Sequence, residues 1–146
     1  MRIELGRIYD LFATGLKTDK KTVVTGVSID SRTIQPGEIF FAIKGENFDG
    51  HNFVNKALEK KAAAAVCSRK DKYAGDNIIY VEDTVTALQD LARFYRRSLD
   101  IPFIAVTGSN GKTTTKDYTG AALAASFKTD YTKGNLNNQT GVPLTV

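Results

Sequence analysis

The chain has 146 residues, of which 42% are hydrophobic and 25% charged, so it has enough apolar side chains for a globular core and is not expected to be disordered. Its net charge of +4 is mild and no basic stripe alternates with aromatic residues, which argues against nucleic acid as a partner. No apolar run approaches the length of a membrane-spanning helix, so we expect no membrane insertion.

The first part of the chain is expected to alternate short helices and strands. Apolar residues at helical spacing predict a helix over 4–13, closed by Thr14 and Gly15. Apolar runs predict strands over 23–29 and 39–43. Helical spacing returns over 52–61, where we expect a second helix.

The same alternation continues to about residue 100. Strands are predicted over 62–66 and 78–81, and Asp83 is expected to cap a long helix that ends near Ser98. Because the residue before a proline disfavours helix, the Asp-Ile-Pro sequence that ends at Pro102 predicts a domain boundary.

We therefore predict an α/β domain over 1–100 and the first βαβ part of a second domain over 101–146. This second part is expected to have a strand over 101–106, a helix from Lys112 to about Ala125 and an extended piece over 128–131. Two strands and one helix are too little for a doubly wound sheet. We expect the polypeptide to be truncated within a nucleotide-binding domain.

The most specific local signal is the sequence Thr107-Gly-Ser-Asn-Gly-Lys-Thr113, placed between the predicted strand and helix. Gly108 and Gly111 permit main-chain angles that point successive N–H groups at one anion, and the helix adds its positive end. Lys112 supplies a mobile charge for the outer phosphates, and the Thr113 hydroxyl suits Mg²⁺. The spacing is tighter than the standard Walker pattern, but the segment still predicts a phosphate-binding loop rather than a plain glycine-rich turn.

Ser31 and Arg32 follow a predicted strand at its carboxyl end, where ligands of α/β folds gather. A guanidinium and a hydroxyl suit a diphosphate or the edge of a uridine ring. A turn in which the Asp-Ser-Arg side chains cap local main chain is the alternative, and chemistry alone favours that turn.

Three further candidates have structural alternatives. In the loop 47–51, Asp49 is expected to cap the helix that follows, and His51 to be a hydrogen-bonded structural residue without a proton-transfer role. Cys67 ends an alanine-valine run, which favours a buried strand thiol over a nucleophile. The asparagines over 135–138 are suited to orienting substrate or phosphate, but they are also ordinary turn formers.

Five ordered motifs resemble the Mur ligases, the ATP-dependent amide ligases that extend the peptide of the bacterial cell-wall precursor. The motifs are Asp30-Ser-Arg32, Pro36-Gly-Glu-Ile-Phe-Phe-Ala-Ile43, Phe48-Asp-Gly-His-Asn-Phe53, Thr107-Gly-Ser-Asn-Gly-Lys-Thr-Thr-Thr115 and Lys133-Gly-Asn-Leu-Asn-Asn-Gln-Thr-Gly-Val-Pro-Leu-Thr145. Together they span essentially the whole chain. The last motif is similar to the member that adds the terminal D-alanyl-D-alanine dipeptide, whereas the tripeptide-forming member usually has a different sequence here.

The resemblance implies a three-domain ligase in which 1–100 binds the UDP-substrate and 101–146 begins the central P-loop ATPase domain. Its substrates would be UDP-N-acetylmuramoyl tripeptide (UDP-MurNAc-tripeptide) and D-Ala-D-Ala, with ATP and Mg²⁺. A substrate carboxylate would attack the γ-phosphate of ATP to give an acyl phosphate, which the dipeptide amine then displaces. An acidic Mg²⁺ ligand and a modified lysine would follow Val146, so we expect these 146 residues alone to be inactive.

The resemblance also implies roles for individual residues. Lys112 would act in catalysis, and Thr113 would be the metal ligand. ATP would be bound by Thr107, Gly108, Ser109, Asn110, Gly111, Lys112, Thr113 and Thr114. The substrates would be bound by Ser31, Arg32, Asn47, Phe48, Asp49, His51, Asn135 and Asn138.

Three alternatives stay open: another Mur ligase, such as the tripeptide-forming enzyme; a non-catalytic module that binds a UDP-sugar; or a generic P-loop NTPase or kinase. A single cysteine and an N-terminus without an apolar signal core favour the cytoplasm. An incomplete sheet edge in the second domain predicts self-association by strand pairing between copies.

Overall fold

The computed structural model describes residues 1–13, 19–70, 72–73, 75–132, 134 and 138–146. Within these ranges, none of the helices combines the length and the apolar character needed to cross a bilayer.

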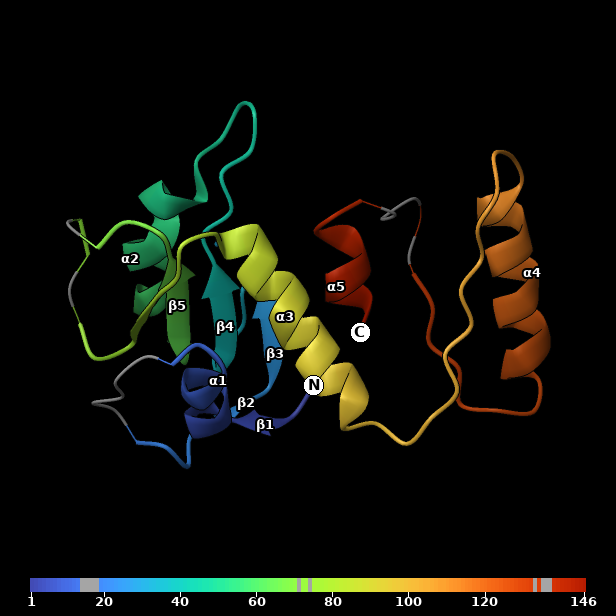
Figure 1. Cartoon of the computed structure of the whole chain (residues 1–146), viewed down its shortest axis with the longest axis horizontal. Helices are drawn as coiled ribbons and strands as arrows, with labels where there is room; N and C mark the ends of the chain where they lie inside the picture. The colour runs from blue at the N-terminus through green and yellow to red at the C-terminus, as the bar shows by residue number, and fades with distance from the viewer. Residues whose placement is uncertain (14–18, 71, 74, 133, 135–137) are drawn as a thin grey trace.

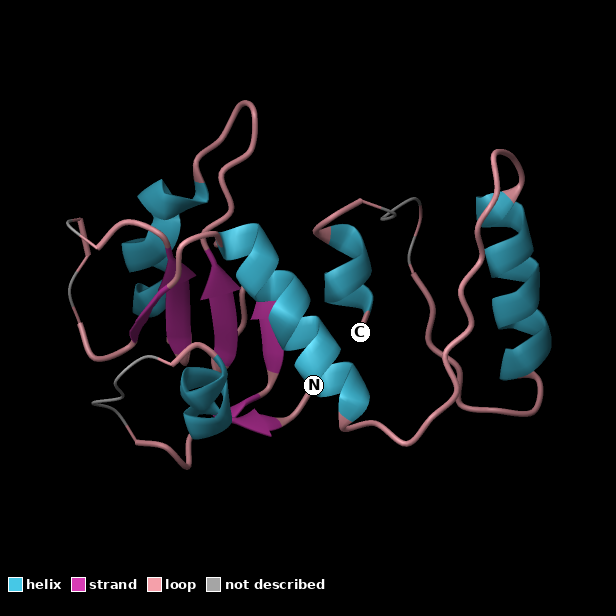
Figure 2. Ribbon diagram, in the orientation of Figure 1, coloured by secondary structure: helices cyan, strands magenta, loops and turns pink. Residues whose placement is uncertain are grey.

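Residues before 100 build a four-stranded parallel sheet (Figures 1 and 2). Its strands, in spatial order, are β3 (Gly26–Ser28), β4 (Glu38–Phe41), β5 (Ala64–Cys67) and β6 (Ile78–Tyr80). The strands are in register, with each buried β4 residue opposite one of β5, as Phe40 is opposite Ala65. Because all four strands run in one direction, the loops after them meet at one edge of the sheet.

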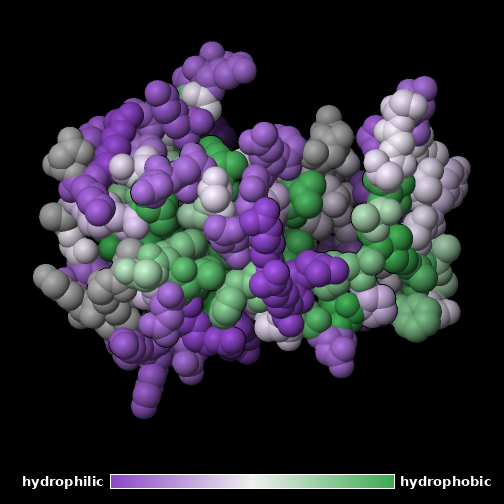
Figure 3. Space-filling view, viewed as in Figure 1, coloured by the Kyte–Doolittle hydropathy of each residue, from purple (hydrophilic) through white to green (hydrophobic). Residues whose placement is uncertain are grey.

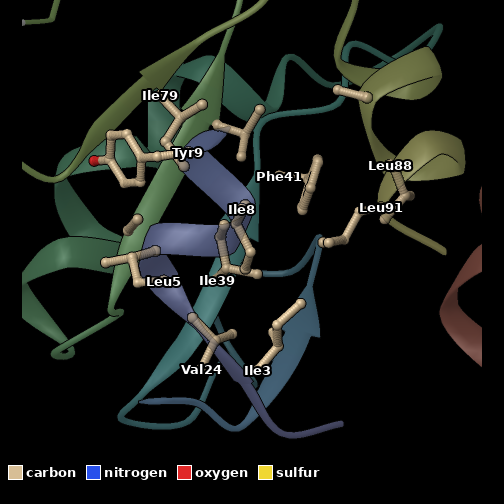
Figure 4. Packing of buried hydrophobic residues seen from close by; sticks show 13 residues of the cluster. Ile3, Leu5, Ile8, Tyr9, Val24, Ile39, Phe41, Ile79, Leu88 and Leu91 are labelled. Atoms are coloured by element: carbon tan, nitrogen blue, oxygen red, sulfur yellow. The ribbon is translucent and has the colours of Figure 1, made fainter. Parts of the chain in front are cut away.

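Helices cover both faces of this sheet. Side chains alternate between faces along a strand, so Ile39 and Phe41 enter one core cluster and Phe40 the other. Helices α1 (Leu5–Leu11) and α3 (Thr84–Arg97) pack on the first face, as Figure 4 shows, and α2 (Val54–Glu59) packs on the second. The predicted α/β class is confirmed, with three layers.

Two predicted caps are confirmed at helix starts. The Asp83 carboxylate accepts a hydrogen bond from the Thr86 N–H at 2.6 Å at the start of α3. The Asp49 carboxylate accepts one from the His51 N–H at 3.0 Å. That second cap begins a 3₁₀ turn, η1 (Gly50–Phe53), so the helix predicted over 52–61 starts only at α2.

The single strand predicted over 23–29 is wrong. It is divided into β2 (Val23–Val24), which pairs antiparallel with β1 (Ile3–Glu4), and β3, which joins the parallel sheet. Between them the Thr25 N–H donates to the Gly37 carbonyl at 3.0 Å. An apolar run predicts extended chain but not which partner each residue finds, so the switch between sheets was not predicted. The helix over 4–13 is confirmed as α1, and its predicted stop at Thr14 and Gly15 lies outside the described residues.

The region after residue 100 has helices but no strand within its described residues. The predicted helix is confirmed as α4 (Lys112–Ala124), and a short α5 (Gly141–Thr145) packs against α3 through side chains that include Leu144. The strand predicted over 101–106 is wrong, and so is the pairing implied for 128–131, because no described strand hydrogen-bonds to either segment. Apolar surface lies over this part of the molecule in Figure 3.

Candidate functional site

The glycine-rich loop lies on the surface just before α4, and every residue from 107 to 111 is exposed. Gly108 has φ 149° and Gly111 has φ 75°, angles that side chains with a Cβ rarely adopt. Among the described residues, no heavy atom lies within 4 Å of the place where a Cβ on Gly111 would stand. Glycine is therefore required at 111 by the main-chain angle and not by lack of space.

The start of α4 is open to an anion. Gly111 is the residue before the helix, and no side chain in the described part of the chain caps the first turn. The first main-chain N–H groups of a helix lack helical partners, and the helix dipole is positive there. The hydroxyl-bearing residues Thr113 and Thr114 are exposed beside these groups. This is the geometry that the phosphate-loop prediction requires.

Lys112 folds back on the loop. Its ammonium donates to the Gly108 carbonyl at 2.5 Å and to the Ser109 carbonyl at 3.3 Å. The ammonium thus stands over the loop that would hold the phosphates. A phosphate oxygen carries more charge than these carbonyls and competes with them for the ammonium.

Tyr131, Thr132 and Gly134 contact residues of α4. The Lys116 ammonium donates to the carbonyls of Thr132 at 2.5 Å and Gly134 at 3.1 Å. The Tyr131 ring lies so close to Gly120 that a Cβ there would stand 2.7 Å from it. These contacts bring the start of the asparagine-rich stretch beside the helix that follows the phosphate loop.

Of the two predicted asparagine ligands, Asn135 lies outside the described residues. The Asn138 side-chain oxygen accepts the Gly141 N–H at 2.7 Å and the Thr140 N–H at 3.3 Å. The structure therefore shows Asn138 as a turn former at the start of α5, and its substrate contact stays a prediction.

Ser31 and Arg32 follow β3 at the carboxyl edge of the sheet, as predicted. Ser31 is buried and Arg32 is exposed. Asp30 holds Arg32 by a forked ion pair, with its two carboxylate oxygens 3.0 Å from Nε and 2.6 Å from a terminal nitrogen. These hydrogen bonds from Arg32 lower the pKa of Asp30 to about 2. The carboxylate fixes the guanidinium, so the turn and a ligand-binding role are compatible.

The loop after β4 presents exposed side chains at the same edge. Asn47 and Phe48 are both exposed, with Phe48 at 76%. The loop closes on itself because the Gly45 N–H donates to the Phe48 carbonyl and the Gly50 N–H to the Ile43 carbonyl, both at 2.8 Å. An exposed aromatic ring beside an amide is suited to stacking on a flat ring and bonding its edge.

His51 directly follows that loop in sequence and is 2% exposed. Its Nδ1 is 2.7 Å from an Asp49 carboxylate oxygen, and its Nε2 accepts the Ser68 N–H at 3.1 Å. Both ring nitrogens are occupied, so this geometry confirms the expected structural histidine. It does not favour the predicted direct contact with substrate.

Arg69 is a candidate that the sequence analysis missed. Its guanidinium is 2.5 Å from the second carboxylate oxygen of Asp49, at the carboxyl end of β5. Burial would raise the pKa of Asp49, but hydrogen bonds from His51 and the charge of Arg69 outweigh it and lower that pKa. In the sequence, Arg69 belongs to a run of charged residues that is typical of a solvated loop. It lies beside Asp49 because β4 and β5 are neighbours in the sheet, so that the segments after them meet.

Cys67 is a buried strand residue, as predicted, and burial raises the pKa of its thiol. A raised pKa suppresses the thiolate, which agrees with a structural role. For metal binding, the described residues hold no group of three His, Cys, Asp or Glu side chains. What they offer Mg²⁺ is the Thr113 hydroxyl beside the phosphate loop, which fits a metal held jointly with phosphate oxygens.

Comparisons with known proteins agree with this arrangement. Residues 23–96 match the Mur ligase family, catalytic domain, and residues 106–146 match the Mur ligase middle domain. The UDP-N-acetylmuramoyl-tripeptide--D-alanyl-D-alanine ligase of Bacillus subtilis (strain 168) is 46% identical over 129 residues, covering 87% of this chain and 28% of the relative. The ligase of the same name from Escherichia coli (strain K12) is 42% identical over 120 residues, covering 82% and 26%.

Solved structures give the same result. A crystal structure of MurF from Acinetobacter baumannii matches with a TM-score of 0.85 at 33% identity, over 99% of this chain and 32% of that chain. MurF ligase from Thermotoga maritima in complex with ADP matches with a TM-score of 0.75 at 36% identity, over 84% and 28%. The chain thus spans about a third or less of the length of these relatives, and it belongs to the Mur ligase family.

Proposed function

We propose that this chain is part of an ATP-dependent amide ligase that adds D-Ala-D-Ala to UDP-MurNAc-tripeptide in peptidoglycan precursor synthesis. The observation that carries the proposal is its identity of 46% and 42% to two ligases of that name. The phosphate loop supports it, because transfer of a phosphoryl group needs charge stabilisation more than covalent chemistry from the protein.

In the proposed reaction, a substrate carboxylate attacks the γ-phosphorus of ATP, ADP leaves, and the acyl phosphate forms. The dipeptide amine then forms the amide, and phosphate leaves. The chain's own contribution is to bind and orient the triphosphate through the N–H groups at the start of α4. Lys112 would exchange the carbonyls of Gly108 and Ser109 for the β- and γ-phosphate oxygens. Mg²⁺, held by Thr113, would neutralise phosphate charge.

The nucleotide-sugar half of the proposal rests on the carboxyl edge of the parallel sheet. The groups there come from the loops after β3, β4 and β5: Arg32, Asn47 and Phe48 are exposed, and Arg69 is half-buried. A guanidinium suits the diphosphate, and an aromatic ring with an amide suits the uracil. We propose Arg69 as an addition to the contacts that the sequence predicted.

Calorimetry on this chain tests the proposal. We expect UDP-MurNAc-tripeptide to bind, and Arg69→Met to weaken that binding about tenfold while Lys70→Met, next to it and exposed, leaves it unchanged. Failure of the wild-type chain to bind the precursor would sink the nucleotide-sugar half. If the chain binds the precursor but does not bind ATP, the non-catalytic module would be favoured for these residues.

A substrate panel on the protein extended past residue 146 decides between the ligase types. The proposed enzyme releases ADP only when D-Ala-D-Ala is supplied, whereas a tripeptide-forming enzyme requires a single amino acid. We expect no such turnover from the 146 residues themselves, and measured D-Ala-D-Ala-dependent ADP release would refute this. A cytoplasmic location and self-association also stay predictions; a strictly monomeric species in light scattering would contradict the second.

A further inference from the structure

Four polar side chains join the loop after β4 to the end of β5. One Asp49 oxygen lies 2.7 Å from Nδ1 of His51, and the other lies 2.5 Å from Arg69. On the far side of the ring, Nε2 lies 3.1 Å from the main-chain nitrogen of Ser68 and 3.0 Å from its Oγ. The imidazole therefore bridges two segments that are separated in sequence by α2 and β5.

The partners determine the protonation state of this bridge. A carboxylate only accepts hydrogen bonds, so Nδ1 carries the hydrogen. The Ser68 N–H only donates, so Nε2 must present its lone pair. The ring is thus the neutral Nδ1–H tautomer. A second proton on Nε2 would set N–H against N–H and break the bridge.

The order Asp49, His51, Ser68 invites comparison with a catalytic triad, in which the histidine activates the serine hydroxyl. Here the lone pair of Nε2 is shared with the main-chain N–H of Ser68, and the ring is 2% exposed. A base that is already bonded and shielded from solvent does not deprotonate a nucleophile. The His51 ring is therefore placed to hold two segments together by hydrogen bonds and not to act as the base of a hydrolase.

We infer that His51 is a positioning residue of the nucleotide-sugar site: by joining Asp49 to Ser68 it fixes the loop 44–50, and with it Asn47 and Phe48, against the end of β5. This inference rests on the proposed function. The ring touches no ligand in this arrangement. Its effect on binding passes through the loop that carries the exposed side chains.

Three variants at position 51 separate the two bonds. The amide of His51→Asn stands where Nδ1 stood and keeps the bond to Asp49, whereas the amide of His51→Gln reaches the place of Nε2 and keeps the bond to Ser68. His51→Ala loses both. We expect calorimetry with UDP-MurNAc-tripeptide to show a loss of about tenfold for each single-bond variant and a larger loss for His51→Ala. Unchanged affinity in a folded His51→Ala would overturn the inference.

A matched control separates positioning from general stability. Thr84→Val removes another buried bond at the same edge of the sheet, from the Thr84 hydroxyl to the Ala42 carbonyl at 3.0 Å. We expect it to lower the urea midpoint of unfolding without changing precursor affinity. If it weakens binding as much as the His51 variants do at equal loss of stability, the specific role of His51 is refuted.

Hydrogen exchange without ligand tests the loop directly. We expect the Gly45 and Gly50 amides, which close the loop, to exchange faster in His51→Ala than in the wild type or Thr84→Val. Unchanged exchange of these two amides in His51→Ala would contradict the inference that His51 fixes the loop. If the wild-type chain bound no precursor, the proposed function would be refuted. The role of His51 in a nucleotide-sugar site would then be refuted as well. Exchange would still report whether the ring fixes the loop.

Discussion

Residues 1–100 and residues 101–146 differ in where their large apolar side chains lie. In the first region Phe41 and Ile79 are fully buried between a sheet and its helices. In the second, Ile104 is 64% exposed and Phe127 is 68% exposed. The comparison shows that most large apolar residues of the first region are packed within the described part of this chain, whereas many of those in the second region are exposed.

The glycine-rich turn over 107–111, which we propose binds phosphate, forms in the second region although large apolar side chains there are exposed. Its shape comes from two glycines and the start of one helix, which are neighbours in sequence. A strand is different, because its main-chain groups need a hydrogen-bonding partner from elsewhere. A glycine-rich turn at a helix start can therefore form from neighbouring residues alone, whereas a strand cannot.

The largest expected effect on stability comes from replacing one phenylalanine by alanine in each region. Phe41→Ala should lower the free energy of unfolding by about 3–5 kcal/mol, because it leaves a cavity in the core. Phe127→Ala should change it by less than about 0.5 kcal/mol, because the ring is mostly exposed. Urea unfolding measures both, and equal losses would erase the contrast between the regions.

Lys112→Ala tests whether the exposed region carries function without a core. Loss of a hydrogen-bonded charge on phosphate costs about 1.5–3 kcal/mol, which is roughly a ten- to hundredfold loss of ATP affinity. Lys128→Ala, an exposed lysine beyond α4, is the control and should bind as the wild type does. Calorimetry with ATP and Mg²⁺ on the protein extended past residue 146 gives the answer; unchanged affinity in Lys112→Ala would remove the nucleotide assignment.

Glycine-to-alanine changes sharpen the comparison, because the two regions need glycine for different reasons. At Gly50 a Cβ would stand 2.7 Å from the main chain of Ile43, so we expect overpacking to cost about 1–3 kcal/mol of global stability. At Gly111 there is space but φ is 75°, so about 1–2 kcal/mol should appear as fraying at the start of α4. Global unfolding reports the first and exchange of the α4 amides the second. A large loss of global stability in Gly111→Ala would contradict this division.

The smallest effect concerns Asp30, whose pKa of about 2 reflects its hydrogen bonds to Arg32. Its folded pKa lies below the unfolded value of about 4, so its stabilising contribution is present above pH 4 and is lost as the pH falls towards 2. The pair is largely exposed, so the contribution is small. Asp30→Asn should flatten the acid limb of the stability curve slightly. An unchanged acid limb would show that the ion pair does not persist in solution.

Local chemistry was enough to predict the glycine-rich turn before α4, the caps at Asp49 and Asp83, and most helices and strands. Each depends on residues close in sequence: glycine angles, a carboxylate near free N–H groups, or regular apolar spacing. The buried state of Cys67 was also predicted from its immediate neighbours, the alanine-valine run that it ends.

Tertiary structure alone decided which segments meet. It divided the extended run over 23–29 between two sheets, gave 101–106 no strand partner among the described residues, and placed Arg69 beside Asp49 across the ends of two strands. Sequence spacing states what a segment can form, but pairing and ion contacts are chosen by competition among distant segments for the same main-chain and charged groups.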